Sequence, residues 1–111
     1  MIAIIDYQAG NIASVKNALE KLGHEFVVTK DPNTILSADK VIFPGQGRAG
    51  PAMKELNALG LVEALKHIQT PFLGICLGMQ LLYEYSEEDE TGCVGILSGK
   101  VRSESLKVRA I

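Results

Sequence analysis

Short apolar runs alternate along the chain with stretches in which apolar side chains recur every three or four residues. Residues 2–5 form a continuous apolar run, which is typical of a parallel strand covered on both faces. Similar runs, rich in valine, isoleucine, leucine and phenylalanine, lie at residues 25–29, 40–43 and 72–75. We therefore predict four strands, each followed by a segment with helical spacing.

The first helical segment covers residues 12–22, between the N-cap residue Asn11 and Gly23, which ends the helix. Its apolar face consists of Ile12, Val15, Leu19 and Leu22. Further helical segments are predicted after Asp31-Pro32, through Met53 and Leu56, from Leu61 to Ile68, and from Leu77 to about Tyr85. Near the end of the chain, two more strands are predicted at Val94–Leu97 and Lys100–Arg102.

The alternation of strands and helices predicts one α/β domain over residues 1–111, with a mostly parallel sheet and helices on both faces. The hydrophobic fraction of 47% and the formal net charge of −2 place the chain among soluble globular proteins. This charge balance gives no electrostatic reason to expect a nucleic acid or a membrane as partner. The start of the chain lacks the basic flank and cleavage site of a signal peptide, so we expect a cytoplasmic protein.

The sharpest chemical signal is the sequence GICLG, in which Cys76 stands between Gly74 and Gly78 where a strand gives way to a helix. A sharp strand-to-helix turn needs glycines at these two positions, because side chains there would collide with the neighbouring backbone. The positive end of the following helix favours the thiolate, which is the reactive form of cysteine. We interpret Cys76 as a nucleophile rather than as a buried core residue.

The second signal is the glycine-rich sequence PGQG at residues 44–47, directly after the third strand. Ligands of parallel α/β sheets bind outside the carboxyl ends of the strands, so this loop and Cys76 should lie close together. Backbone N–H groups of such a loop, together with that of Leu77, can stabilise an oxyanion. A phosphate-binding role is disfavoured because the lysine of a P-loop is absent, and no cofactor or metal site is expected.

The block PFLGICLGMQLL at residues 71–82 resembles the nucleophile motif of class I glutamine amidotransferases. The opening IIDY, followed by Gly10-Asn11, is similar to the start of the glutaminase subunits of imidazole glycerol phosphate synthases. The same is true of FPGQG at residues 43–47 and YEYSEE at residues 83–88. The resemblance runs to about residue 101, and it implies a flavodoxin-like three-layer sandwich.

The resemblance also implies roles for individual residues. Cys76 matches the nucleophile that converts L-glutamine into a glutamyl thioester and ammonia. Oxyanion-hole N–H groups are expected from Gly45, Gln46, Gly47 and Leu77, in a loop that flips when the partner is occupied. Gln80 and Glu88 match positions that hold the glutamine substrate.

The implied partner is a cyclase subunit with a (βα)8-barrel fold, which would form a heterodimer with this chain. Asn11 lies where the family faces that partner. Ammonia would pass through a protected channel to a ribulosyl-aminoimidazole nucleotide, giving imidazole glycerol phosphate and an aminoimidazole carboxamide ribotide in histidine biosynthesis.

The chain departs from the family in one respect. The family places a Gln-Phe-His-Pro-Glu motif well downstream of the nucleophile, and no such segment occurs before Ile111. His24 and His67 do not match its histidine, so we expect both to be ordinary surface residues. We therefore expect that the C-terminal half of the domain is missing, and that the chain alone is inactive.

Three alternatives stay open at this point. The chain could belong to another class I amidotransferase, such as that for anthranilate or pyridoxal phosphate synthesis. A cysteine-elbow peptidase or redox sensor would explain Cys76 but not Gln80 with Glu88. A non-catalytic domain that binds a partner would agree with the missing histidine.

The acidic cluster at residues 87–90 is expected to be a solvated helix end, and the tyrosines, Tyr7 included, to be packing residues.

Overall fold

A parallel sheet of four strands runs through the middle of the protein. The computed structural model describes residues 1–7 and 12–102. The strands of this sheet are β1 (Ile2–Ile5), β2 (Phe26–Thr29), β3 (Lys40–Phe43) and β4 (Phe72–Gly74). Their order is β2-β1-β3-β4, which is that of the first four strands in flavodoxin-like sheets. The four predicted strands are confirmed.

The central strand β1 pairs in parallel with both β2 and β3. Ile2 stands opposite Phe26 on one side and opposite Lys40 on the other. Ala3, Ile4 and Ile5 are all buried, because both faces of this strand are covered. The continuous apolar run at the start of the sequence is the direct consequence of that position.

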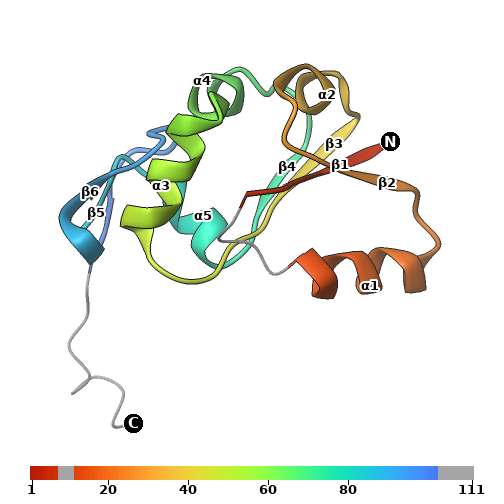
Figure 1. Ribbon diagram of the computed structural model, residues 1–111, viewed down its shortest axis with the longest axis horizontal. Coiled ribbons are helices and arrows are strands. Elements are labelled where there is room, and N and C mark those ends of the chain that lie inside the picture. The colour runs from red at the N-terminus through yellow and green to blue at the C-terminus, as the bar shows by residue number, and fades with distance from the viewer. Residues whose placement is uncertain (8–11, 103–111) are drawn as a thin grey trace, which may run out of the picture.

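Helices cover both faces of the sheet, so the predicted three-layer α/β sandwich is confirmed. On one face lies α1 (Ile12–Leu22), whose Leu19 packs against Ile4 and Ile42. The other face carries α2 (Pro32–Ser37), α3 (Ala49–Ala58), α4 (Leu61–Lys66) and α5 (Leu77–Leu81). Figure 1 shows α1 on the opposite side of the strands from α2 and α4.

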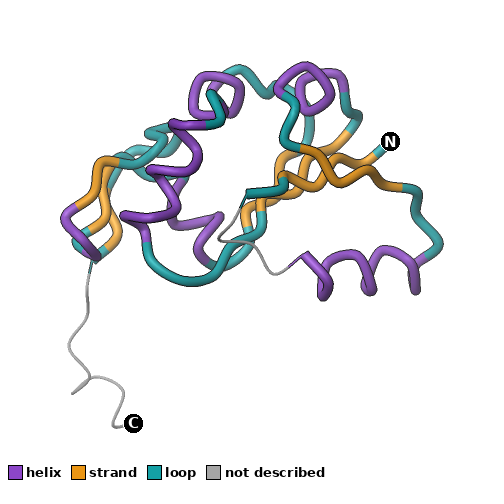
Figure 2. Tube along the Cα trace, in the orientation of Figure 1, coloured by secondary structure: helices purple, strands orange, loops and turns teal. Residues whose placement is uncertain are grey.

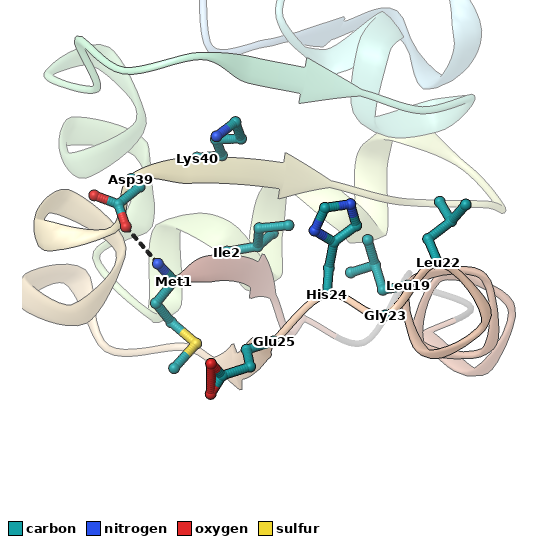
Figure 3. Close-up of a pocket in the computed structure, with 9 residues that line it drawn as sticks. All are labelled: Met1, Ile2, Leu19, Leu22, Gly23, His24, Glu25, Asp39 and Lys40. Carbon is teal, nitrogen blue, oxygen red and sulfur yellow. Dashed lines mark hydrogen bonds and ion pairs between the residues drawn. The ribbon is translucent and has the colours of Figure 1, made fainter.

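The predicted apolar face of α1 is correct except at Leu22. This side chain is 70% exposed, because it belongs to the last turn of the helix and borders an open depression of about 580 Å³. Figure 3 shows the depression at the amino ends of the strands, next to Lys40 and the ion pair between Met1 and Asp39. Gly23 ends the helix with a φ of 75°, as predicted. The predicted N-cap Asn11 lies outside the described residues.

Strand β4 is covered on one face only, whereas its sequence predicts a strand buried on both. Leu73 is 56% exposed. On this face α1 packs over β1 and leaves an apolar groove of about 360 Å³ beside β4, lined by Val15, Leu19, Ile42 and Leu73 among others. Among the described residues, β4 is the edge strand on that side of the sheet.

A second, small sheet lies at one end of the molecule (Figure 2). It contains β5 (Tyr85–Ser86), β6 (Thr91–Gly92) and β7 (Lys100–Val101), in the order β6-β5-β7. Between β5 and β6, the chain makes a 3-10 turn, η1 (Glu88–Glu90).

Two predictions for this region are wrong. The helix that begins at Leu77 ends at Leu81 rather than near Tyr85, and no strand forms at Val94–Leu97. The cause is tertiary: Val94 N–H donates to Leu81 O, and Leu97 N–H donates to Leu82 O. These donors satisfy the carbonyls at the helix end, so the chain leaves the helix there.

No described helix is long and apolar enough to span a membrane. The larger core cluster lies between the sheet and helices α2 to α5. Phe43 from β3 stands at its centre, with its ring 5.2 Å from that of Tyr7 and 6.1 Å from that of Phe72. This core places the ends of β3 and β4 directly against the start of α5.

The core predicts a stability difference between two leucines. Leu56 of α3 is fully buried, so Leu56→Ala should lower the free energy of unfolding by about 2–5 kcal/mol. The matched change Leu22→Ala, at an exposed side chain, should change it by less than about 1 kcal/mol. Urea denaturation followed by circular dichroism measures both values, and equal losses would contradict the described packing.

Candidate functional site

Cys76 stands on the sharp turn between β4 and α5. Its φ of 52° and ψ of −121° are unusual for a residue that is not glycine. Such a backbone conformation costs on the order of 1–3 kcal/mol and must be held by its surroundings. The side chain is exposed. The predicted strand-to-helix elbow is therefore confirmed, with its cysteine at the apex.

The two glycines of the elbow are required by close backbone contacts. A Cβ atom on Gly78 would lie 1.9 Å from Phe43 O, because the first turn of α5 packs directly on the end of β3. A Cβ atom on Gly74 would lie 2.7 Å from Met79 Cα. Glycine at these positions thus lets α5 fold back onto the strands and turn Cys76 outward.

The glycine-rich loop lies beside Cys76, as the sequence predicts. Pro44 and Gly45 follow β3 directly and are buried, whereas Gln46 and Gly47 are exposed. Gly45 is held on two sides: its carbonyl accepts a hydrogen bond from Leu77 N–H at 3.1 Å, and a Cβ atom there would lie 2.2 Å from the Tyr7 hydroxyl. The loop therefore fits tightly between β1 and α5.

A cavity of about 200 Å³ opens at Cys76. It is lined by Ser14, Val15, Pro44, Gly45, Gln46, Ile75 and Cys76. These residues follow β1, β3 and β4, so the cavity lies at the carboxyl ends of the strands. The chain order reverses between β1 and β3, and this is the switch point at which open α/β sheets bind ligands.

The N–H group of Leu77 is engaged within the protein. It donates to Gly45 O, so an oxyanion formed at Cys76 would have to replace this carbonyl. This replacement of Gly45 O as the acceptor requires the loop to reorient. Gly47, whose φ is 110°, gives the loop conformational freedom. The role of residues 45–47 and Leu77 in an oxyanion hole stays a prediction.

Gln80 and Glu88, the predicted substrate-binding residues, do not line this cavity. Gln80 is half-buried on α5, and its N–H donates to Cys76 O. Glu88 lies beyond the glycine-rich loop, where its carboxylate accepts from Ala49 N–H at 3.0 Å at the start of α3. The structure thus places both near the elbow or the loop, but their contact with a substrate stays a prediction.

The acidic cluster is not the solvated helix end that the sequence predicts. Asp89 forms an ion pair with Arg48 at 2.6 Å and accepts from Gly50 N–H at 3.1 Å. Together with Glu88, it caps the start of α3 and holds the far end of the glycine-rich loop. The hydrogen bond from Arg48, followed by that from Gly50 N–H, lowers the pKa of Asp89. This contact joins residues that are 41 positions apart, so no local sequence pattern predicts it.

Both histidines of the sequence are remote from the cavity at Cys76. His24 lines the depression at the opposite, amino end of the strands (Figure 3). His67 follows the last residue of α4, and its Nδ1 atom lies 2.7 Å from Glu63 O. Neither side chain lines the cavity beside Cys76.

A strained cysteine elbow beside a glycine-rich loop, on a parallel 2-1-3-4 sheet, is the arrangement expected from the resemblance to class I amidotransferases. The family model described as "Glutamine amidotransferase class-I" matches residues 3–108. The chain therefore belongs to the class I glutamine amidotransferase family.

Relatives named "Imidazole glycerol phosphate synthase subunit HisH" are similar to this chain. Those from Bacteroides thetaiotaomicron and Xanthomonas campestris pv. campestris are each 50% identical over 101 residues, covering 91% of this chain and 52% and 50% of the relatives. A third, from Dehalococcoides mccartyi, is 47% identical over 114 residues, covering 97% of this chain and 56% of the relative. The chain spans about half the length of the curated relatives it matches.

The close packing at the elbow predicts that alanine destabilises the protein much more at one glycine than at another. Gly78→Ala would force a methyl group into the backbone of β3, so it should lower the free energy of unfolding by about 3 kcal/mol or more. Gly92→Ala, where no atom lies within 4 Å of the new Cβ, should change it by less than about 1 kcal/mol. Chemical denaturation gives both values, and a stable Gly78→Ala variant would contradict the contact between α5 and β3.

The Asp89 contacts predict an acid-sensitive part of the stability. The folded state lowers the pKa of Asp89. The stabilisation that this carboxylate provides is therefore complete above its pKa in the unfolded chain, about 3.9, and is lost as the pH falls through its lowered pKa in the folded state. Asp89→Asn should therefore destabilise the protein near neutral pH, and the difference from wild type should shrink in acid and in high salt.

Urea denaturation at about pH 6 and about pH 3 measures this difference. Glu20→Gln, which removes an exposed carboxylate on α1, serves as the matched control. A difference between wild type and Asp89→Asn that stays constant across this pH range would contradict the ion pair.

Proposed function

We propose that this chain carries the nucleophile part of a glutaminase, which releases ammonia from L-glutamine. The observation that carries this proposal is the position of Cys76 on a strained elbow, at a cavity whose other side is the glycine-rich loop. Membership of the class I glutamine amidotransferase family supports the choice of substrate.

In the proposed reaction, the Cys76 thiolate attacks the side-chain amide carbon of glutamine. The electron pair of the C=O bond moves to oxygen to give a tetrahedral intermediate; as that pair returns and re-forms the C=O bond, the C–N bond breaks and the amide nitrogen takes up a proton and leaves as ammonia. Water hydrolyses the resulting glutamyl thioester to glutamate and restores the thiol. Gln80 and Glu88 are proposed to hold the glutamine.

The oxyanion of the intermediate needs N–H donors, which we propose come from Leu77 and from residues 45–47. Leu77 N–H becomes available once Gly45 O moves away from it. The glutaminase would thus rest in a state with a closed oxyanion hole, and a partner that favours the reoriented loop would activate it.

The proton transfers require a general base, and we propose that it comes from outside these 111 residues. Both histidines of the sequence are remote from the Cys76 cavity. In a cysteine–base pair, losing one member removes most of the rate enhancement. The chain alone is therefore proposed to be inactive as a glutaminase.

We further propose that the parent protein is the glutaminase subunit of an imidazole glycerol phosphate synthase. Three relatives at 47–50% identity carry that name. The partner would be a (βα)8-barrel cyclase in a cytoplasmic heterodimer, and Asn11, outside the described residues, would face it. The ammonia would enter histidine biosynthesis.

Ammonia release from glutamine tests this proposal. The chain alone is compared with a fusion of residues 1–101 to the C-terminal half of the Bacteroides thetaiotaomicron relative, each mixed with a cyclase subunit and its nucleotide. We expect activity in the fusion, a rate at least about 10³-fold lower in the chain alone, and loss of activity in the fusion carrying Cys76→Ala.

Activity of the chain alone that needs Cys76 would overturn the inference that the base lies elsewhere. A fusion that binds the cyclase but releases no ammonia would favour a non-catalytic binding domain instead. Ammonia release that survives Cys76→Ala would contradict the assigned nucleophile.

A further inference from the structure

We propose that the Tyr7 hydroxyl is a positioning group for the glycine-rich loop, and that it fixes the Pro44 carbonyl while the Gly45–Gly47 segment reorients. This inference rests on the proposed function for its catalytic consequence, but not for its structural part. The pattern of the sequence marks Tyr7 only as a packing residue.

The contact itself is short and buried. Tyr7 follows β1, is 2% exposed, and its hydroxyl donates to Pro44 O at 2.6 Å. Its ring packs on that of Phe43, with centroids 5.2 Å apart, so the side chain is held from two directions. A tyrosine needed only for packing would not require this hydrogen bond, because phenylalanine fills nearly the same volume.

The hydroxyl remains a donor at every physiological pH. Burial raises the pKa of the Tyr7 phenol well above its usual range, because the phenolate would lose its hydration. Without this donor, the buried Pro44 carbonyl would lack the partner that the structure gives it, and an unpaired buried carbonyl is unfavourable. The contact therefore ties the loop to the central strand of the sheet.

The same hydroxyl also restricts the next residue. A Cβ atom on Gly45 would lie 2.2 Å from Tyr7 Oη and 3.0 Å from Gly78 N. Gly45 thus occupies a slot between the tyrosine and the first turn of α5, where its carbonyl accepts from Leu77 N–H. Anchoring Pro44 on one side of this slot determines where Gly45 O lies relative to the amide next to Cys76.

This arrangement divides the loop into an anchored and a movable part. Pro44 has a fixed φ and a carbonyl bound by Tyr7, whereas Gly47 has a φ of 110° and open space where a Cβ atom would stand, with no other atom within 4 Å. Rotation of the Gly45–Gln46 peptide would release Leu77 N–H without displacing Pro44. Tyr7 would thereby keep the donors of the oxyanion hole at the correct distance from Cys76.

Amide hydrogen exchange on this chain tests the positioning role without any enzymatic activity. In Tyr7→Phe, we expect the protection of Leu77 N–H to fall about tenfold, because its acceptor Gly45 O is no longer held in place. The protection of Ile75 N–H, which donates to Phe43 O at 3.0 Å, should stay unchanged. Tyr83→Phe, at a half-buried tyrosine, is the matched control and should alter neither amide.

Kinetics of the active fusion described above give the second readout. Tyr7→Phe should lower kcat about tenfold and leave KM nearly unchanged, because oxyanion contacts are made only in the transition state. Equal loss of protection at Leu77 and Ile75 would reduce Tyr7 to a general stabilising residue and overturn the proposal. So would unchanged exchange at Leu77, or an unchanged kcat in an active fusion.

The two proposals fail in different ways. If the wild-type fusion releases no ammonia, the proposed function is wrong, and the exchange of Leu77 relative to Ile75 still decides the role of Tyr7. If the wild-type fusion is active and Tyr7→Phe changes neither readout, only the positioning role is wrong.

Discussion

The close approach of α5 to the end of β3 is the constraint on which the rest of the site depends. Gly78 lies so near the backbone of Phe43 that any side chain there would overlap it. Because α5 begins directly on top of the strands, the chain must turn sharply after β4. The strained backbone of Cys76 is the result of this turn, and packing around it supplies the free energy that keeps the strain in place.

The same contact controls the glycine-rich loop. Where α5 meets β3, the loop that leaves β3 has to pass between the helix and Tyr7, which lies just after the end of β1. Only glycine fits at position 45, between the Tyr7 hydroxyl and the first turn of α5. The elbow and the loop are therefore one structural unit. A change in the loop conformation alters the hydrogen bond of the Leu77 amide, next to Cys76.

The far end of the loop is held by a segment that comes later in the chain. Glu88 and Asp89 bind the backbone N–H groups of Ala49 and Gly50, and Arg48 adds an ion pair. These carboxylates lie on the 3-10 turn η1, between β5 and β6 of the small second sheet, so this turn is coupled to the start of α3. Between this capped helix and the anchored Pro44, only a few loop residues are free to reorient, which suits a loop proposed to open and close an oxyanion hole.

The sequence alone determined the four strands, the α/β class, and the elbow with its two glycines, because local periodicity and steric requirements are written in neighbouring residues. It did not predict the early end of α5, the exposure of Leu22 and Leu73, or the contacts of Tyr7 and Asp89. Each of these depends on residues far apart in the chain: Val94 and Leu97 end α5, Pro44 accepts from Tyr7, and Arg48 meets Asp89. Only the tertiary structure brings such partners together, since a hydrogen bond or an uncovered face leaves no periodic trace in the sequence.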